Sequence, residues 1–90
     1  MLGARHETTL KAMWGLAEAL GHQGKHLEAE PMWRELVAAC KEILGVHNRD
    51  TLETMTNLAM TLKLEGKHAE AASLEREVDD VTARMAVLPL

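Results

Sequence analysis

The chain has 90 residues, enough for one small domain, and its 14 acidic and 10 basic side chains give a formal net charge of -4. This balance argues against a nucleic-acid surface, which needs clustered Lys and Arg, and no apolar run is long enough to span a membrane. Hydrophobic residues make up 47% of the chain without any Phe or Tyr. With few β-branched residues other than Thr, the sequence predicts an all-α fold.

The first predicted helix covers residues 9–23, and Gly24 follows as a turn residue that accepts a left-handed backbone. Its apolar positions recur at helical spacing and give one buried stripe: Leu10, Met13, Leu16, Ala17 and Leu20. The second predicted helix covers residues 26–44 and ends at Gly45. Its inner face is expected to carry Ala29, Met32, Trp33, Leu36, Cys40, Ile43 and Leu44.

Pro31 is the one discordant residue of the second helix. A helix that begins near His26 forfeits about one backbone hydrogen bond at this proline. The alternative is a helix that begins at Pro31 itself, where proline is favoured in the first position. We expect the earlier start, because the second half of the chain has Ser73 at the equivalent position within a continuous pattern.

The third and fourth predicted helices cover residues 51–65 and 68–87, with Gly66 as the turn and Pro89 as the stop. Asp50 is the expected N-cap of the third helix, and Glu53 completes a capping box. The third helix has the stripe Leu52, Met55, Leu58, Ala59 and Leu62. The fourth carries Ala71, Leu74, Val78, Val81, Met85 and Leu88, and acidic residues narrow its apolar face.

The chain repeats itself at a spacing of 42 residues. Residues 2–36 and 44–78 are identical at 15 of 35 positions without a gap, which is the signature of a repeat architecture. We therefore expect a single domain, residues 1–90, made of one repeat at 2–43 and another at 44–88. Leu16 and Leu58 are equivalent, and both are expected in the tightest part of their hairpins.

The repeated motifs resemble those of tetratricopeptide repeats, in particular the 42-residue subclass found in kinesin light chains. The second repeat matches that pattern at Leu44-Gly45, Thr51-Leu52, Thr54, Asn57-Leu58-Ala59, Leu62, Gly66-Lys67 and Glu70-Ala71. The first matches at Leu2-Gly3, His6, Thr9-Leu10, Leu16-Ala17, Leu20, Gly24-Lys25, Glu28-Ala29-Glu30 and Pro31. The resemblance implies an α-solenoid of two antiparallel helix-turn-helix repeats, four helices in all, and a role in protein–protein interaction.

The first helix of each repeat lines the concave side in such arrays. The face left after the buried stripe is assigned gives the candidate ligand groove: Trp14, Glu18, Thr56, Asn57, Met60 and Lys63. Trp14 either anchors a ligand or packs against a neighbouring helix. Asn57 either binds an extended ligand backbone, as the resemblance implies, or satisfies groups between its own helices. Gly15 replaces this asparagine in the first repeat.

No catalytic or metal-binding pattern is present, so we expect neither an enzyme nor a cofactor. His22 and His26 are four residues apart, but Gly24 separates them, so they share no helical face. His26 and His68 are repeat equivalents with an expected structural role. Cys40 lies on the buried stripe and is expected to be a small core residue. As the single cysteine it excludes an intrachain disulfide and favours a reducing compartment. With no secretory signal visible, we expect a cytoplasmic protein.

Two functions remain open. The first is a segment of a longer scaffold or adaptor that binds a protein partner, as a peptide or helix, in the concave groove. The second is self-association, in which the repeats of two copies stack into a homo-oligomer. A stable stack usually needs about three repeats, and the chain begins at the Leu2-Gly3 spacer and ends in an apolar tail at residues 85–90. These features favour a chain that is not a stable monomer.

Overall fold

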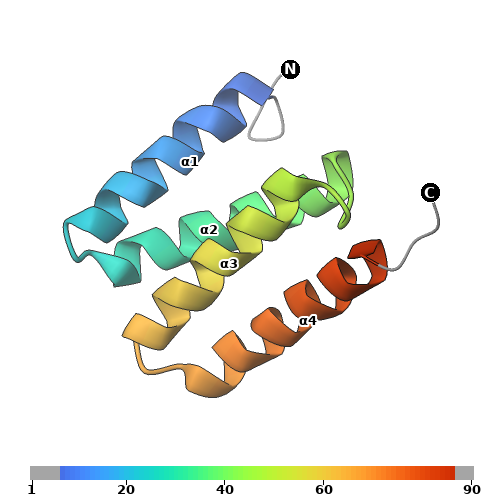
Figure 1. The fold of residues 1–90 in the computed structure, drawn as a ribbon. Helices are drawn as coiled ribbons and strands as arrows, with labels where there is room; N and C mark the ends of the chain where they lie inside the picture. The colour runs from blue at the N-terminus through green and yellow to red at the C-terminus, as the bar shows by residue number, and fades with distance from the viewer. Residues whose placement is uncertain (1–6, 87–90) are drawn as a thin grey trace.

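The computed structural model describes residues 7–86, which form four α-helices in two successive hairpins (Figure 1). The helices are α1 (Glu7–His22), α2 (His26–Ile43), α3 (Arg49–Leu64) and α4 (His68–Ala86), with no strand among the described residues. Each helix packs on the next one along the chain, and the molecule measures 41 × 37 × 16 Å. The predicted all-α, four-helix repeat fold is confirmed.

Each hairpin turns at one glycine, and the two glycines occupy the same position of the repeat. Gly24 has a φ of 79° and Gly66 a φ of 85°, a backbone conformation that costs a residue with a Cβ atom free energy. After the turn, α2 begins at His26, so Pro31 lies inside the helix and the earlier of the two expected starts is correct.

The start of α3 differs from the expected one. Asn48, and not Asp50, caps the helix: its side-chain oxygen accepts a hydrogen bond of 2.8 Å from the backbone N–H of Asp50. The capping box of Asp50 and Glu53 is therefore wrong. Asp50 lies in the first turn of the helix, where its negative charge is favourable at the positive end of the helix dipole, and Glu53 lies one turn further on.

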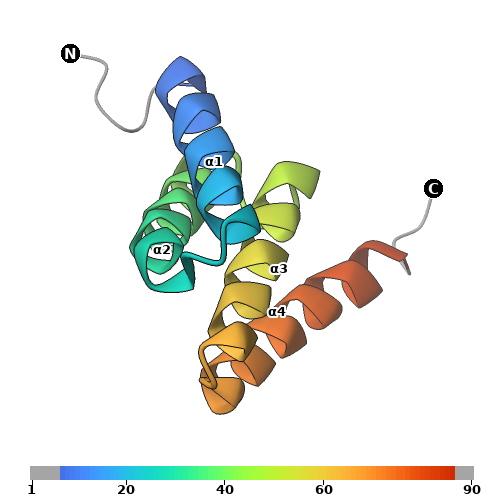
Figure 2. The same cartoon turned by 90° about the vertical axis from the view of Figure 1, so that its left-hand side faces the viewer.

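The core lies between the two central helices, α2 and α3. Met55 and Leu62 are fully buried, and Trp33 and Leu58 are each only 3% exposed. Leu16, the repeat equivalent of Leu58, is 53% exposed, which corrects the expectation that both are tightly packed. The reason is position: among the described residues α3 packs on both α2 and α4, whereas the main contacts of α1 are with α2. Figure 2 shows α1 at one end of the row of helices.

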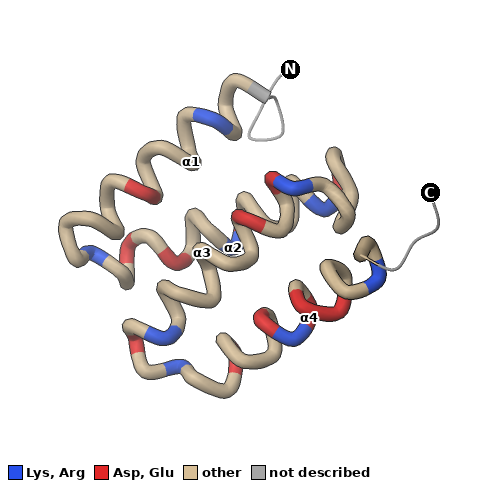
Figure 3. Tube along the Cα trace, in the orientation of Figure 1, with Lys and Arg blue, Asp and Glu red and all other residues tan. Residues whose placement is uncertain are grey.

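The last helix, α4, is buried along one narrow face only. Ala71 and Val81 are buried, whereas Met85 is 41% exposed; Leu88 and Pro89 lie outside the described residues. Acidic positions recur along α4, with basic positions among them (Figure 3). Two acidic residues pair with lysines of the central helices: Glu77 with Lys41 at 2.8 Å, and Glu75 with Lys63. These ion pairs join α4 to α2 and α3 at its solvated side.

A compact ionic cluster joins α2 to the turn between α3 and α4. The Glu30 carboxylate accepts hydrogen bonds from Arg34 Nε at 2.6 Å and Lys67 Nζ at 2.9 Å. Arg34 also pairs with Glu70 at 2.6 Å, and Lys67 lies 3.3 Å from Glu65. The contacts with Glu65, Lys67 and Arg34 lower the pKa of Glu30 to about 2. Burial, together with the neighbouring Glu30, raises the pKa of Glu65.

The two carboxyls should give opposite pH effects on stability. Glu65 binds its proton more tightly in the folded chain. Its contribution to stability should therefore rise as the pH falls from neutral towards 4.5, the usual pKa of a glutamate. Glu30 binds its proton less tightly, so its contribution to stability should be lost between about pH 4.5 and 2.

Glu65→Gln should therefore be more stable than the parent at pH 7 and lose that advantage in mild acid. Urea midpoints measured from pH 7.5 to 2.5 test this, with Glu30→Gln expected to remove the loss below pH 4.5. An unchanged difference between parent and Glu65→Gln across this range would contradict the assignment.

Candidate functional site

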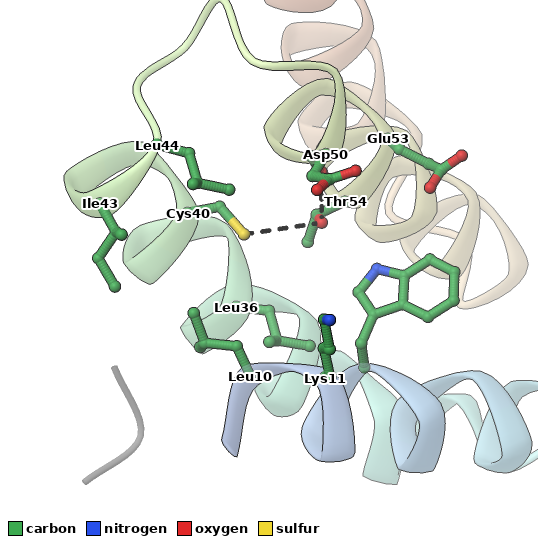
Figure 4. A pocket seen from close by; sticks show the side chains of 10 residues that line it. Leu10, Lys11, Leu36, Cys40, Ile43, Leu44, Asp50, Glu53 and Thr54 are labelled. Atoms are coloured by element: carbon green, nitrogen blue, oxygen red, sulfur yellow. Dashed lines mark hydrogen bonds between the residues drawn. The ribbon is translucent and has the colours of Figure 1, made fainter. Parts of the chain in front are cut away.

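A cleft opens between the first halves of α1 and α3, over the C-terminal half of α2 (Figure 4). Its volume is about 550 Å3, within the range of small-ligand sites. It is lined by Leu10, Lys11 and Trp14 of α1, by Leu36, Cys40, Ile43 and Leu44 from α2 and its end, and by Asp50, Glu53 and Thr54 of α3. The floor is therefore mainly apolar, and the charged side chains belong to the two flanking helices.

The apolar floor is open to solvent where α2 ends. Ile43 is 47% exposed and Leu44 is 42% exposed, although the sequence pattern placed both on the buried face of the second helix. That expectation is wrong because α1 and α3 flank this end of α2 and leave the cleft between them. Exposed aliphatic side chains in a concave setting are a common feature of partner-binding sites.

Two tryptophans support the α1 side of the cleft. Trp14 is half-buried, lines the cleft, and meets Trp33 edge to face, with ring centroids 5.7 Å apart and planes at 88°. This T-shaped contact is favourable for aromatic pairs. Trp33 in turn is anchored in the core. The structure thus gives Trp14 a packing contact on one side and leaves part of it at the cleft.

The deepest polar groups of the cleft belong to Cys40 and Thr54. Their Sγ and Oγ1 atoms are 3.9 Å apart, and the Thr54 hydroxyl donates a 2.7 Å hydrogen bond to the Asp50 carbonyl. Burial raises the pKa of the Cys40 thiol, which disfavours the nucleophilic thiolate. Cys40 is only 6% exposed, so its expected role as a small core residue is confirmed.

The structure brings one of the six residues predicted for the groove to the cleft. Trp14 alone lines the cleft, and Glu18 lies further along α1, exposed. Thr56 lines a smaller depression between α3 and α4, Met60 is 57% exposed, and Lys63 is engaged by Glu75. Asn57 is half-buried. The sequence pattern did not indicate that α2 lines the cleft, because it assigned Ile43 and Leu44 to the buried core.

The described residues can also be compared with the requirements of a metal site and of a membrane-spanning helix. No group of three or more His, Cys, Asp and Glu side chains in residues 7–86 is arranged to hold a metal ion. His26 is half-buried at the start of α2, and its Nδ1 atom is buried without a hydrogen-bond partner; the equivalent His68 is exposed. Within the same residues, none of the helices combines the length and apolar character needed to cross a membrane.

Comparison with known proteins agrees with the helical repeat. The family model described as tetratricopeptide repeat matches residues 8–78, a range that includes the larger part of each of the four helices. The chain therefore belongs to the tetratricopeptide repeat family. A search of curated proteins finds no similar sequence. Tetratricopeptide repeats generally mediate protein–protein interaction and are generally not catalytic.

Proposed function

We propose that the chain is a non-catalytic interaction module that binds a peptide or helix of a partner protein on the concave side formed by α1 and α3. One observation carries this proposal: a mainly apolar cleft of about 550 Å3 with exposed aliphatic side chains lies between these helices. A half-buried tryptophan at the edge of such a cleft suits the role of an interaction anchor. The partner would cover Ile43 and Leu44 and the exposed part of Trp14.

The finer assignments rest on sequence and placement. The 42-residue period supports membership of the kinesin-light-chain-like subclass. The single, buried Cys40 supports a reducing, cytoplasmic setting. Glu18, Thr56, Asn57, Met60 and Lys63 would form the outer part of a longer groove, with Trp14 at its centre. A partner that extends beyond the cleft would cross these positions.

Replacement of Trp14 by Ala should weaken partner binding by more than about 1 kcal/mol while the helical content is retained. The probe is a set of peptides selected from a random twelve-residue phage library on the immobilised full chain. Affinity is measured by fluorescence anisotropy and helicity by circular dichroism. Leu27→Ala is the matched control, because Leu27 is 77% exposed and lies outside the cleft. Equal losses for the two variants, or a collapse of the fold in Trp14→Ala, would count against a binding role.

A second candidate function is self-association through α1, and a specific comparison favours it. Ala12, Leu16 and Ala19 are exposed, whereas their repeat equivalents Thr54, Leu58 and Thr61 are 1%, 3% and 5% exposed. On α3 the equivalent face meets α2, where Thr54 Oγ1 lies 3.9 Å from Cys40 Sγ. The partner in this case is a second copy of the chain, with its α1 packed against the same face.

Self-association predicts a melting temperature that rises with protein concentration, because pairing stabilises only the folded state. Leu16→Glu should abolish that dependence, since it places a charge at the centre of the paired face. Analytical ultracentrifugation of both proteins provides the mass. A monomer at high concentration with a concentration-independent melt would exclude this alternative and leave the peptide-binding proposal in place.

A further inference from the structure

The charges around the cleft differ between its two sides. Lys11 of α1 lines one side, and Asp50 and Glu53 of α3 line the other, with the apolar floor between them (Figure 4). All three side chains belong to exposed residues. The nearest cation along α3, Arg49, does not line the cleft; it lines the smaller depression towards α4, which shares Glu53 with the cleft. A ligand that crosses the cleft from α1 to α3 therefore meets a positive charge first and two negative charges last.

These three charges have no ion-pair partner within residues 7–86, although many exposed charges of this molecule are paired. Two lysines outside the cleft show the paired arrangement. Lys41 and Lys63, with side chains 35% and 49% exposed, each contact a glutamate of α4. Lys11 makes no such contact, and neither do the two carboxylates opposite. The charges of the cleft are thus available to groups outside the chain.

We infer that the peptide bound in this cleft carries a large apolar side chain with an acidic residue on its α1 side and a basic residue on its α3 side. The inference rests on the proposed function and adds the partner's chemistry to it. The apolar side chain would cover the exposed Ile43 and Leu44. The acidic group would meet Lys11, and the basic group would meet Asp50 and Glu53.

The two kinds of contact have different effects. Burial of an apolar side chain supplies most of the affinity, whereas charges at the rim of an interface mainly select the partner and speed association. Two carboxylates against one ammonium group give the rim a negative balance, so a basic residue in the peptide matters more than an acidic one. A strongly acidic peptide should therefore be disfavoured. Affinity should also fall as salt is raised, because exposed charges are screened.

The test is a selection of the random twelve-residue phage library on the full chain, followed by charge reversal in both partners. The selected peptides should share a large apolar residue with Lys or Arg within a few positions on one side. Glu53→Lys should weaken the affinity for a selected peptide about fivefold. Exchange of that peptide's basic residue for Glu should restore most of the lost affinity. Glu35→Lys is the matched control, because Glu35 is an exposed glutamate of α2 that does not line the cleft. Circular dichroism verifies that each variant is folded, and Asp50→Asn serves as a milder second variant.

The possible results distinguish a failure of the predicted charge preference from a failure of the proposed peptide binding. Peptides that depend on Trp14 but show no preference for a basic residue would overturn the inference and leave the proposed function standing. The same conclusion would follow if Glu53→Lys and Glu35→Lys weakened binding equally, or if reversal of the peptide's charge failed to restore it. A selection that enriches no peptide over an uncoated surface would count against both.

Discussion

Leu58→Ala is expected to lower the free energy of unfolding by about 2–5 kcal/mol, whereas Leu16→Ala should change it by about 1 kcal/mol or less. The two leucines occupy the same position of the repeat, but Leu58 is 3% exposed and Leu16 is 53% exposed. Removal of three side-chain carbons leaves a cavity only where neighbours surround the site. Urea denaturation of both variants at low protein concentration provides the measurement.

This comparison controls for the chemistry of the substitution, since the residue removed and the helix position are the same. Glu53→Ala on the exposed side of α3 supplies the baseline of a nearly silent change. Similar losses for both leucine variants would mean that α1 is covered in solution. Such a result, if it depended on protein concentration, would support self-association over a free monomer.

The second large effect is expected for Trp33→Ala, which should cost about 3–5 kcal/mol. Trp33 is 3% exposed, belongs to the core cluster, and supports Trp14 through the edge-to-face contact at 5.7 Å. A domain of this size has roughly 5–15 kcal/mol of stability in total, so the variant should be close to unfolding at physiological temperature. Thermal melts followed by circular dichroism test this expectation.

A matched change at the equivalent position of the second repeat sharpens the test. That residue is Glu75, half-buried on α4 and paired with Lys63. Glu75→Ala should cost about 1 kcal/mol or less, because exposed ion pairs contribute little. If Trp33→Ala melted no lower than Glu75→Ala, the core would not be centred between α2 and α3.

The fold could be predicted almost completely from the sequence because local signals and the repeat agree. Apolar stripes at helical spacing, together with Gly24 and Gly66 before each second helix, are sufficient to place four helices in two hairpins. The start of α3 was missed because Asn48 and Asp50 are both good capping residues. Only the backbone angles decide between them, and these put Asn48 in the extended conformation that a cap requires.

The candidate site could be predicted only in part, because it depends on how helices of different repeats are spaced. Trp14 was recognisable as a large side chain outside the buried stripe. Ile43 and Leu44 were not, since periodicity shows which face of α2 is apolar and does not show where the flanking helices leave it uncovered. Leu16 illustrates the same limit: its pattern is that of Leu58, but among the described residues α1 makes its main contacts with one helix, α2, whereas α3 makes them with both α2 and α4.

The most direct test of the central claim is a map of amide chemical-shift changes, recorded by nuclear magnetic resonance on the full chain with a selected peptide. Binding in the cleft predicts the largest changes at Lys11, Trp14, Ile43, Leu44 and Glu53 and in the indole N–H of Trp14. It also predicts small changes along the outer face of α4. Changes centred instead on Ala12, Leu16 and Ala19, and reproduced by concentration alone, would contradict the peptide-binding cleft and support self-association through α1.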